Sequence, residues 1–272
     1  LVEREALVRI DVSKEGNALS LLEGKITPNN TPLVEPEGVA TTAKLEFTPG
    51  TPTDASKCVF GTWVKMTRFN IAQQAIISNN TSIFGFSNYS TQDALYFNSE
   101  GHETLIMNAR HRDPTGWFQC VFSWDSDEST GANRIKLYVN GVEDTSFDVN
   151  AIAAKVASTE VCPWTTNGVV NKIGNYSGDY LNAYLAQTFC VDGGSIQNSD
   201  YAIGDFGETD SLGNWRPIDL ENSEDITWGD QGWLLDYAVA PGTSNGAGTD
   251  VSGEDNHFSS TNLVASDKTK DS

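Results

Sequence analysis

Apolar and polar residues alternate most clearly in the middle of the chain. Residues 134–140 read Arg-Ile-Lys-Leu-Tyr-Val-Asn, which is the period-2 pattern of a strand with one buried face. Asn140-Gly141 then supplies two residues that tolerate the positive φ angles of a tight hairpin turn. The strand pattern resumes at 142–148. The pattern therefore predicts an antiparallel hairpin.

Short apolar runs of this kind recur along the chain, separated by Gly, Asn, Asp and Pro. Many short strands with such turn signals are typical of a β-sandwich or jelly roll. Trp63 and Trp117 fall in the apolar rows and are predicted core anchors, whereas 151–157 could form one or two helical turns. The other predicted strands lie at about 43–48, 58–66, 73–78, 82–87, 94–98, 103–108, 117–124, 170–173, 183–191 and 233–237.

Several segments also carry a resemblance. In chain order they are Phe47-Thr-Pro-Gly50 with Phe60-Gly-Thr-Trp-Val-Lys65, Arg112-Asp-Pro-Thr-Gly-Trp-Phe118, the 134–142 hairpin with the strand at 179–193, Gly204-Asp-Phe-Gly-Glu208 with Trp215-Arg-Pro217, and Asp250-Val-Ser-Gly-Glu-Asp-Asn-His-Phe258. Together they resemble the LamG/concanavalin-A-like jelly-roll domains of tailed-phage structural proteins, especially those of marine phages. The resemblance implies an all-β, antiparallel jelly-roll sandwich over residues 45–260. It identifies a functional class only weakly, because this fold hosts lectins, hydrolases and inert structural modules.

Three regions are expected along the chain. Residues 1–40 form an N-terminal arm and linker, 41–204 form the LamG-like sandwich, and 205–272 form an acidic, loop-rich extension that packs on the sandwich and ends in a mobile tail. Alternating apolar positions in 1–12 could make a strand or a short helix. At Val8, Ile10 and Val12 they predict a strand that docks on a neighbouring subunit or virion partner by strand addition.

The charge is strongly acidic and unevenly distributed. The net charge is −20, and residues 192–272 hold 16 acidic but only 3 basic residues. Such a surface repels phosphate backbones, so nucleic-acid binding is not expected. No segment approaches the ~20 apolar residues of a membrane-spanning helix, and no secretory signal is visible. The chain begins with Leu1, which fits a processed chain or one portion of a longer protein.

The four cysteines are Cys58, Cys120, Cys162 and Cys190, and none has a CxxC spacing. Three of them lie in apolar, strand-like runs, which favours small buried residues with free thiols. Disulfides stay open as the alternative, since four cysteines allow three pairings.

No catalytic pattern is present. A glycoside hydrolase needs two carboxylates flanking the bond, and the Glu-x-Asp-x-x-Glu strand of laminarinase-like enzymes on this fold is absent. The acid-rich runs lie in predicted turns, which indicates solvated loop charge. His102, His111 and His257 lack metal-ligand spacing, and no nucleophile elbow, P-loop or dinucleotide fingerprint occurs. The sequence therefore predicts a protein that is not an enzyme.

Calcium is the one cofactor to consider, because LamG-like modules often bind it through loop Asp and Asn oxygens. The loop that starts at Asp125 and Asp127 begins like a calcium loop, but its sixth and twelfth positions are Thr130 and Lys136 where Gly and an acid are required. Asp179 and Asp192, which bracket the strand at 183–191, are therefore the calcium candidates that remain. No other cofactor is implied.

Carbohydrate binding needs an exposed aromatic face with amide or carboxylate partners. Trp164, Tyr176 and Tyr180 are the candidate ligand-binding residues, because they lie in loop-like stretches with Asn167, Asn175 and Asp179 nearby. The alternative is that these aromatic residues cover a sheet edge or a contact between subunits.

The leading hypothesis is a non-enzymatic phage virion protein on a tail fibre, tail appendage or capsid. It would present a lectin-like jelly roll to host or environmental glycans, with other virion proteins as partners and a homo-oligomeric assembly. The alternative is a secreted or cell-surface carbohydrate-binding module of a bacterium. A glycan hydrolase with an unrecognised site is a weaker alternative.

Overall fold

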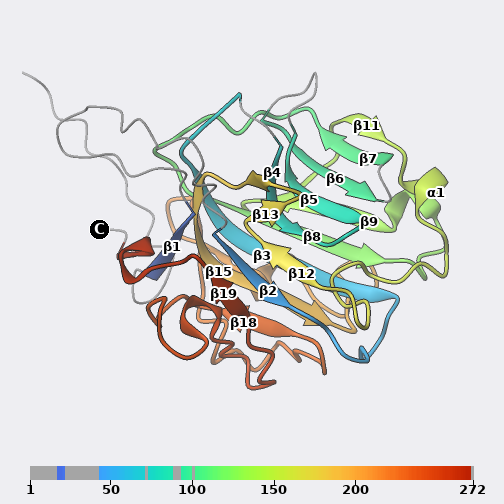
Figure 1. Ribbon diagram of the computed structural model, residues 1–272. Coiled ribbons are helices and arrows are strands. Elements are labelled where there is room, and N and C mark those ends of the chain that lie inside the picture. Colours follow the sequence, from blue (N-terminus) through green and yellow to red (C-terminus); the bar gives the residue numbers. More distant parts are fainter. Residues whose placement is uncertain (1–16, 22–42, 71–72, 88–92, 100–101, 271–272) are drawn as a thin grey trace, which may run out of the picture.

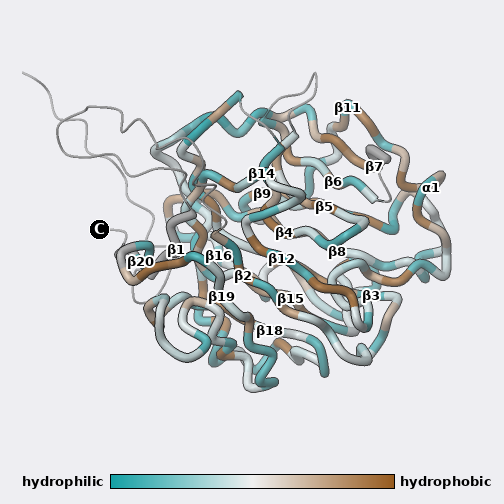
Figure 2. Tube along the Cα trace, viewed as in Figure 1, coloured by the Kyte–Doolittle hydropathy of each residue, from teal (hydrophilic) through white to brown (hydrophobic). Residues whose placement is uncertain are grey.

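The structure is a computed structural model that describes residues 17–21, 43–70, 73–87, 93–99 and 102–270. Two eight-stranded sheets pack face to face, and the pairings within them are antiparallel (Figure 1). The protein is thus an all-β antiparallel sandwich of the jelly-roll type, as the alternating pattern predicts. Hydrophobic stretches follow the central strands, and hydrophilic stretches follow many of the connections (Figure 2).

Sheet A has a branched edge. Its strands, in spatial order, are β10 (Val142–Asp144), β9 (Ile135–Val139), β8 (Phe118–Asp125), β3 (Lys57–Met66), β15 (Ala183–Asp192), β1 (Asn17–Leu21) and β20 (Lys268–Lys270). The far edge of β15 is shared, because β1 pairs with its first half and β18 (Trp233–Leu235) with its second half. A bulge at Gln187, which has a φ of +43°, separates the two halves.

Sheet B faces sheet A. In spatial order it contains β11 (Phe147–Asn150), β7 (His102–Met107), β6 (Leu95–Ser99), β5 (Ser82–Phe86), β4 (Gln74–Ser78), β12 (Asn171–Ile173), β2 (Lys44–Phe47) and β19 (Ser259–Thr261). The remaining elements are short. They are the hairpins β13 (Asn175–Tyr176) with β14 (Asp179–Tyr180) and β16 (Glu208–Thr209) with β17 (Trp215–Arg216), the helix α1 (Ile152–Lys155), and 3-10 turns at Gly131–Asn133, Ile203–Phe206, Gly246–Gly248 and Ala265–Asp267.

The predicted hairpin at 134–148 is correct at its turn and wrong at its end. Asn140 and Gly141 have φ angles of +49° and +76°, as a tight two-residue turn requires. The second strand does not continue to 148, however. It breaks after Asp144, whose carboxylate accepts the Ser146 N–H at 2.7 Å, and the chain crosses to sheet B as β11.

The main core lies between the two sheets and is rich in aromatic rings. Phe122 of β8 packs against Phe84 and Phe97 of sheet B, with ring centroids 5.5 and 5.0 Å apart. Trp63 and Trp117 are buried as predicted, but they belong to a separate cluster on the outer face of sheet A, where Trp215 also packs.

Residues 196–234 cover the rest of that outer face. Phe189 of β15 points outward and stacks on Phe206 with ring centroids 5.1 Å apart and planes within 9°. Leu220 and Trp228 join the same apolar cluster. Sheet A is therefore buried on both faces, which explains why every residue of β15 except Tyr184 is buried, without the alternation of a strand that has one wet face.

The two terminal regions contribute strands to the sandwich. Residues 17–21, inside the expected arm, pair with β15 of the same chain, so this part is not a free arm. The docking strand with Val8, Ile10 and Val12 lies outside the described residues. From the C-terminal region, β18 and β20 join sheet A and β19 joins sheet B, so the sheets extend beyond residues 41–204.

The Asp-x-Ser-Gly-x-x-Asn segment is a structural clip. The Asp250 carboxylate accepts the Leu234 N–H at 2.8 Å and the Ser252 and Asn256 N–H groups at 2.9 Å each. The Asn256 amide donates onward to the carbonyls of Asp230 and Gly232. Backbone groups that would otherwise be unpaired near β18 are satisfied in this way.

Candidate functional site

A pocket of about 280 Å³ opens where the β4–β5 turn meets the loop between α1 and β12. This loop, residues 157–169, is called the pocket loop below. Such a volume lies just below the range of about 300–1,000 Å³ that is typical of small-molecule sites. The lining residues are Asn79, Thr81, Ser82, Ser99, Trp124, Thr159, Glu160, Val161, Pro163, Thr166 and Val169.

Asn79 organises one wall of the pocket and ties it to the other. Its Oδ1 accepts the backbone N–H groups of Thr81 and Ser82 at 2.9 and 2.8 Å, which shapes the β4–β5 turn. Its Nδ2 donates to the carbonyl oxygen of Pro163 at 2.9 Å, across the pocket. Asn79 is almost fully buried, so both groups would be costly to leave unpaired.

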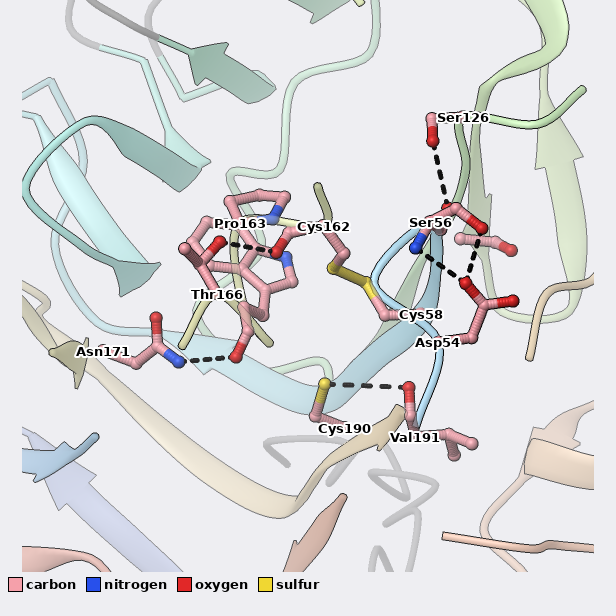
Figure 3. Close-up of a disulfide and its surroundings, with 12 residues drawn as sticks. Asp54, Ser56, Cys58, Ser126, Cys162, Pro163, Thr166, Asn171, Cys190 and Val191 are labelled. Carbon is pink, nitrogen blue, oxygen red and sulfur yellow. Dashed lines mark hydrogen bonds between the residues drawn. A yellow bond between two sulfur atoms is a disulfide. The ribbon is translucent and has the colours of Figure 1, made fainter. Parts of the chain in front are cut away.

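A disulfide between Cys58 of β3 and Cys162 holds the pocket loop to sheet A (Figure 3). The expectation of free thiols is therefore wrong for this pair, because folding brings together two cysteines that are 104 residues apart in the sequence. Cys120 and Cys190 are free and buried. Burial raises the pKa of both thiols, which keeps them protonated and unreactive.

Trp164 anchors the pocket loop and does not present the exposed aromatic face that was expected of a ligand-binding residue. Its side chain is fully buried, and its ring lies within 6.4 Å, centroid to centroid, of Phe60, Phe97 and Phe122. The Asn171 amide donates to the Trp164 carbonyl at 2.6 Å, which fixes the chain as it returns to β12 (Figure 3). The expectation of an exposed ring at Trp164 was wrong because a Trp in a loop-like stretch can still enter the core.

Tyr176 and Tyr180 lie apart from Trp164, in the β13–β14 hairpin. Both are partly exposed, and Tyr176 packs on an apolar cluster of β4, β5, β6 and β7 that includes Ala75 and Tyr96. The Asn175 amide donates to the Asp179 carbonyl at 3.1 Å within the hairpin. Through these contacts Tyr176 covers part of the face of sheet B, whereas the alternative that the sequence left open was a sheet edge or a contact between subunits.

The structure does not bring the two calcium candidates together. Asp179 lies just before β15 and Asp192 ends it, and a ten-residue strand covers about 30 Å. Asp192 is buried and its Oδ2 accepts the Thr53 and Gln231 N–H groups at 2.7 and 3.1 Å, which joins three segments. Burial raises its pKa above the usual value for Asp.

The Asp125 loop is also held internally. The Asp125 side chain accepts the Asp127 N–H at 3.0 Å and the Ser195 hydroxyl at 2.7 Å. Within the described part of the chain, no three His, Cys, Asp or Glu side chains gather as a metal site. The same residues contain no helix with the length and hydrophobicity to cross a bilayer.

The pocket lining is polar and carries little charge. Thr81, Ser82, Ser99, Thr159 and Thr166 contribute hydroxyl-bearing side chains, and Trp124, Val161, Pro163 and Val169 contribute apolar ones. Among the described lining residues, Glu160 is the only carboxylate and there is no Lys, Arg or His. One carboxylate can accept two ligand hydroxyl groups at once, whereas glycoside hydrolysis requires two carboxylates.

The residues that line the pocket cannot be recognised from the sequence, and the reason is physical. The two walls come from 79–82 and 159–169, which are far apart in the chain, and each looks by itself like an ordinary polar turn. The only local signal was the density of Asn, Thr and Ser at both places.

No family model matches the chain, and no curated protein matches it by sequence. Similarity to solved structures is clear but distant. A protein of Bacteroides ovatus, assigned as carbohydrate-binding, is 13% identical with a TM-score of 0.50, over 80% of this chain and 58% of that one. A heptameric SAP-like pentraxin of Limulus polyphemus is 11% identical with a TM-score of 0.46, over 80% and 90%.

A third similar structure is domain 4 of AbnA, an extracellular arabinanase of Geobacillus stearothermophilus, in complex with arabinotriose. It is 14% identical with a TM-score of 0.34, over 55% of this chain and 67% of that one. The sheet topology and the similarity to the Bacteroides ovatus structure agree on an antiparallel jelly-roll sandwich. At 13% identity this similarity establishes the fold alone.

Proposed function

We propose that this protein is a non-enzymatic glycan-binding module, and that its site is the pocket between the β4–β5 turn and the pocket loop. The observation that carries the proposal is the lining, in which hydroxyl groups, one carboxylate and apolar surfaces face the same small space. Sugars present hydroxyl groups on a ring with apolar faces, so they match both kinds of surface. The fold, which lectins share with other proteins, is compatible with this role.

The charge of the pocket narrows the ligand to uncharged glycans. The described lining residues offer Glu160 and no cationic partner, in a chain whose net charge is −20. Uronic acids and sulfated sugars would be repelled by both. Binding of neutral glycans should depend little on ionic strength, because no ion pair forms.

A panel of neutral and acidic oligosaccharides, measured by calorimetry, tests the proposal. Wild-type protein should bind neutral members only. Glu160→Gln keeps the size of the side chain but removes the charge, and a hydrogen bond to a charged group contributes about 1.5–3 kcal/mol, so affinity should fall about 10- to 100-fold. Glu221→Gln, on the exposed turn near Leu220, is the matched control and should bind like wild type. Equal binding by all three proteins would rule out this pocket.

The same panel tests the non-enzymatic assignment and calcium. Release of reducing sugar that disappears in an Asp or Glu variant would indicate a hydrolase. Calcium at Asp179 or Asp192 stays a prediction; binding that is lost in a chelator and restored by Ca²⁺ would support it.

The biological setting is a separate proposal. Display on a phage virion is supported by the resemblance of the five segments to phage jelly rolls, and labelling of intact particles tests it. The disulfide favours the alternative of a secreted or cell-surface bacterial module, since disulfides form and persist in oxidising compartments. Recovery of the protein from particle-free medium, with none on purified particles, would decide for the alternative.

Assembly through the N-terminal segment also remains a proposal. Since β1 belongs to sheet A, deletion of residues 1–40 would expose the edge of β15, and deletion of 1–16 is the cleaner test. A truncated chain that stays folded but no longer joins a homo-oligomer or a particle, by sedimentation, would support docking by this segment.

A further inference from the structure

The disulfide lies at the wall of the pocket. Cys162 stands between Val161 and Pro163, and both neighbours line the pocket. Its partner Cys58 lies in β3 at the position opposite Trp124 of β8, which also lines the pocket. The covalent bond therefore joins the pocket loop to the strands beneath the site.

The part of the loop that carries Glu160 depends most on this bond. Upstream, the Arg134 guanidinium donates to the Val156 carbonyl at 2.7 Å, and downstream the next fixed residue is Cys162. Between them, Thr159 and Val161 are exposed, and the Glu160 N–H bonds to Ala157 within the same segment.

The rest of the loop has its own anchors. Trp164 is buried in the core, the Asn79 amide bonds to Pro163, and the Gly168 N–H donates to the Pro49 carbonyl at 2.9 Å. Opening of the disulfide would leave these contacts in place. The change would concentrate on 157–161. Cys162 would keep its N–H bond to the Ala55 carbonyl, at 2.7 Å, as a polar tether to the chain before β3, and its carbonyl would still accept the Thr165 N–H and the Thr166 hydroxyl within the loop.

We propose that the Cys58–Cys162 disulfide positions Glu160, so that the pocket binds its glycan in the oxidised protein and loses it when a dithiol opens the bond. The proposal rests on the proposed function of the pocket. The exchange is balanced: the dithiol is oxidised to a disulfide, and its two electrons and two protons convert Cys58 and Cys162 to thiols. Cys58 and Cys162 are positioning residues, because neither needs to contact the sugar.

The cysteine content of the chain supplies matched variants. Affinity for the best neutral oligosaccharide of the panel is measured before and after treatment with dithiothreitol, and again after reoxidation. Wild type should weaken by about ten-fold or more, as for loss of the Glu160 contact, and should recover on reoxidation. Cys58→Ala/Cys162→Ala should be weak in both conditions, whereas Cys120→Ala/Cys190→Ala should respond like wild type.

A second measurement needs no substitution. If oxidation strengthens glycan binding, the glycan must by linkage stabilise the disulfide, so bound oligosaccharide should lower the fraction of protein that is reduced at a given ratio of reduced to oxidised dithiol. Both sulfur-bearing residues are fully buried, and reductant must wait for the loop to open. Hydrogen exchange should rise in 157–161 of the reduced protein and stay unchanged in β15.

The outcomes separate the two proposals. Oxidised protein that binds glycan with the same affinity after reduction refutes the disulfide proposal and leaves the glycan site standing. Oxidised protein that binds nothing refutes the glycan site, and exchange confined to 157–161 then still supports the positional role of the disulfide. Global loss of protection on reduction overturns the proposal, because the bond would then hold the whole fold.

Discussion

Two regions outside the main core, the cover on the outer face of sheet A and the pocket, differ sharply in how they are packed. On the outer face of sheet A, residues 196–234 place Phe206, Leu220 and Trp228 against the strands, and the gap is filled by packed rings. At the pocket, the Asn79 amide links the β4–β5 turn to the pocket loop, the disulfide ties that loop to β3, and hydroxyl-bearing residues line the space that remains.

The comparison shows where the recognisable motifs are used. Gly204–Glu208 and Trp215–Pro217 hold the cover of sheet A, and Asp250–Phe258 clips β18 in place. None of these segments lines the pocket. The residues that make the fold recognisable are thus the ones that close apolar faces, whereas the proposed binding site is made from turns without a motif.

The largest expected effect on stability comes from the cover on the outer face of sheet A. Phe206→Ala removes a fully buried ring that stacks on Phe189, and such truncations cost about 3–5 kcal/mol. The free energy of unfolding, from denaturant titration, should fall by that amount, while the glycan affinity of the folded protein stays unchanged. A parallel loss of affinity would show that the two regions are not independent.

Acid should lower the free energy of unfolding through His111, which belongs neither to the cover of sheet A nor to the pocket. Burial lowers the pKa of His111 to about 4, from 6.5. The unfolded chain therefore takes up a proton at higher pH than the folded one, and stability that is present above pH 6.5 is lost as the pH falls towards about 4. The difference corresponds to about 3 kcal/mol at most.

His111→Phe tests this pH dependence. The imidazole stacks on Phe118 with centroids 4.5 Å apart, and its buried Nε2 has no hydrogen-bond partner among the described residues, so a phenyl ring can replace it. The unfolding free energy of the variant should change less than that of wild type between pH 7 and pH 4.5. Equal slopes would contradict the prediction.

Gly141 and Gly168 have similar φ angles, so their Val variants distinguish the effect of overpacking from that of backbone strain. Gly141, with φ of +76°, is covered by Trp215, whose Cε3 lies 2.5 Å from an added Cβ, whereas Gly168, with φ of +73°, has open space around it. Both Val variants incur backbone strain, but only Gly141→Val also overpacks, at about 1–3 kcal/mol. It should unfold at a lower temperature than Gly168→Val.

The link across the pocket should respond to a change of one atom. In Asn79→Asp the acceptor for the Thr81 and Ser82 N–H groups is kept, but the donor to Pro163 becomes an oxygen. Loss of a buried hydrogen bond costs about 1–3 kcal/mol, and glycan affinity should fall about ten-fold. Affinity should partly recover in acid, where the protonated carboxyl can donate again. Thr51→Ala is the control, because it removes the hydroxyl that accepts the Asn167 amide at the far end of the loop.

The smallest effect belongs to the surface hairpin β16–β17. Leu212 at its tip is 82% exposed, and a lone exposed apolar residue contributes little. Leu212→Ser should change stability by less than about 0.5 kcal/mol and leave glycan affinity unaltered. A larger change in stability or in glycan affinity would indicate that Leu212 makes a contact that matters for that property.

The pattern of short apolar runs predicted most strands of the sandwich because the strands that form the core must bury apolar side chains. It failed for β19 and β20, whose sequences Ser-Ser-Thr and Lys-Thr-Lys carry no apolar alternation. Such strands form because a neighbouring edge offers hydrogen-bond partners, and that edge is not visible in a local window. The break between β10 and β11 was missed for the same reason, since the two halves belong to different sheets.

The proposed site was less accessible to the sequence than the fold. Aromatic residues near amides suggested Trp164, Tyr176 and Tyr180, but local spacing cannot distinguish a ring that enters the core from one that faces solvent. The partner of Cys162 was one of three choices in the sequence and is fixed by the packing of the pocket loop on β3. Only the tertiary fold brings Asn79 to Pro163.

The pairing of β1 with β20 has a mechanical consequence. The strands are antiparallel, and Asn17 at the start of β1 lies opposite Lys270 at the end of β20. If the chain is pulled at Asn17 and at Lys270, both forces act at the same end of the β1–β20 pair. The hydrogen bonds between the two strands then open one after another instead of together. An adhesive module held in flowing liquid by both ends would yield first at this edge. The strands that frame the pocket would carry load only after that.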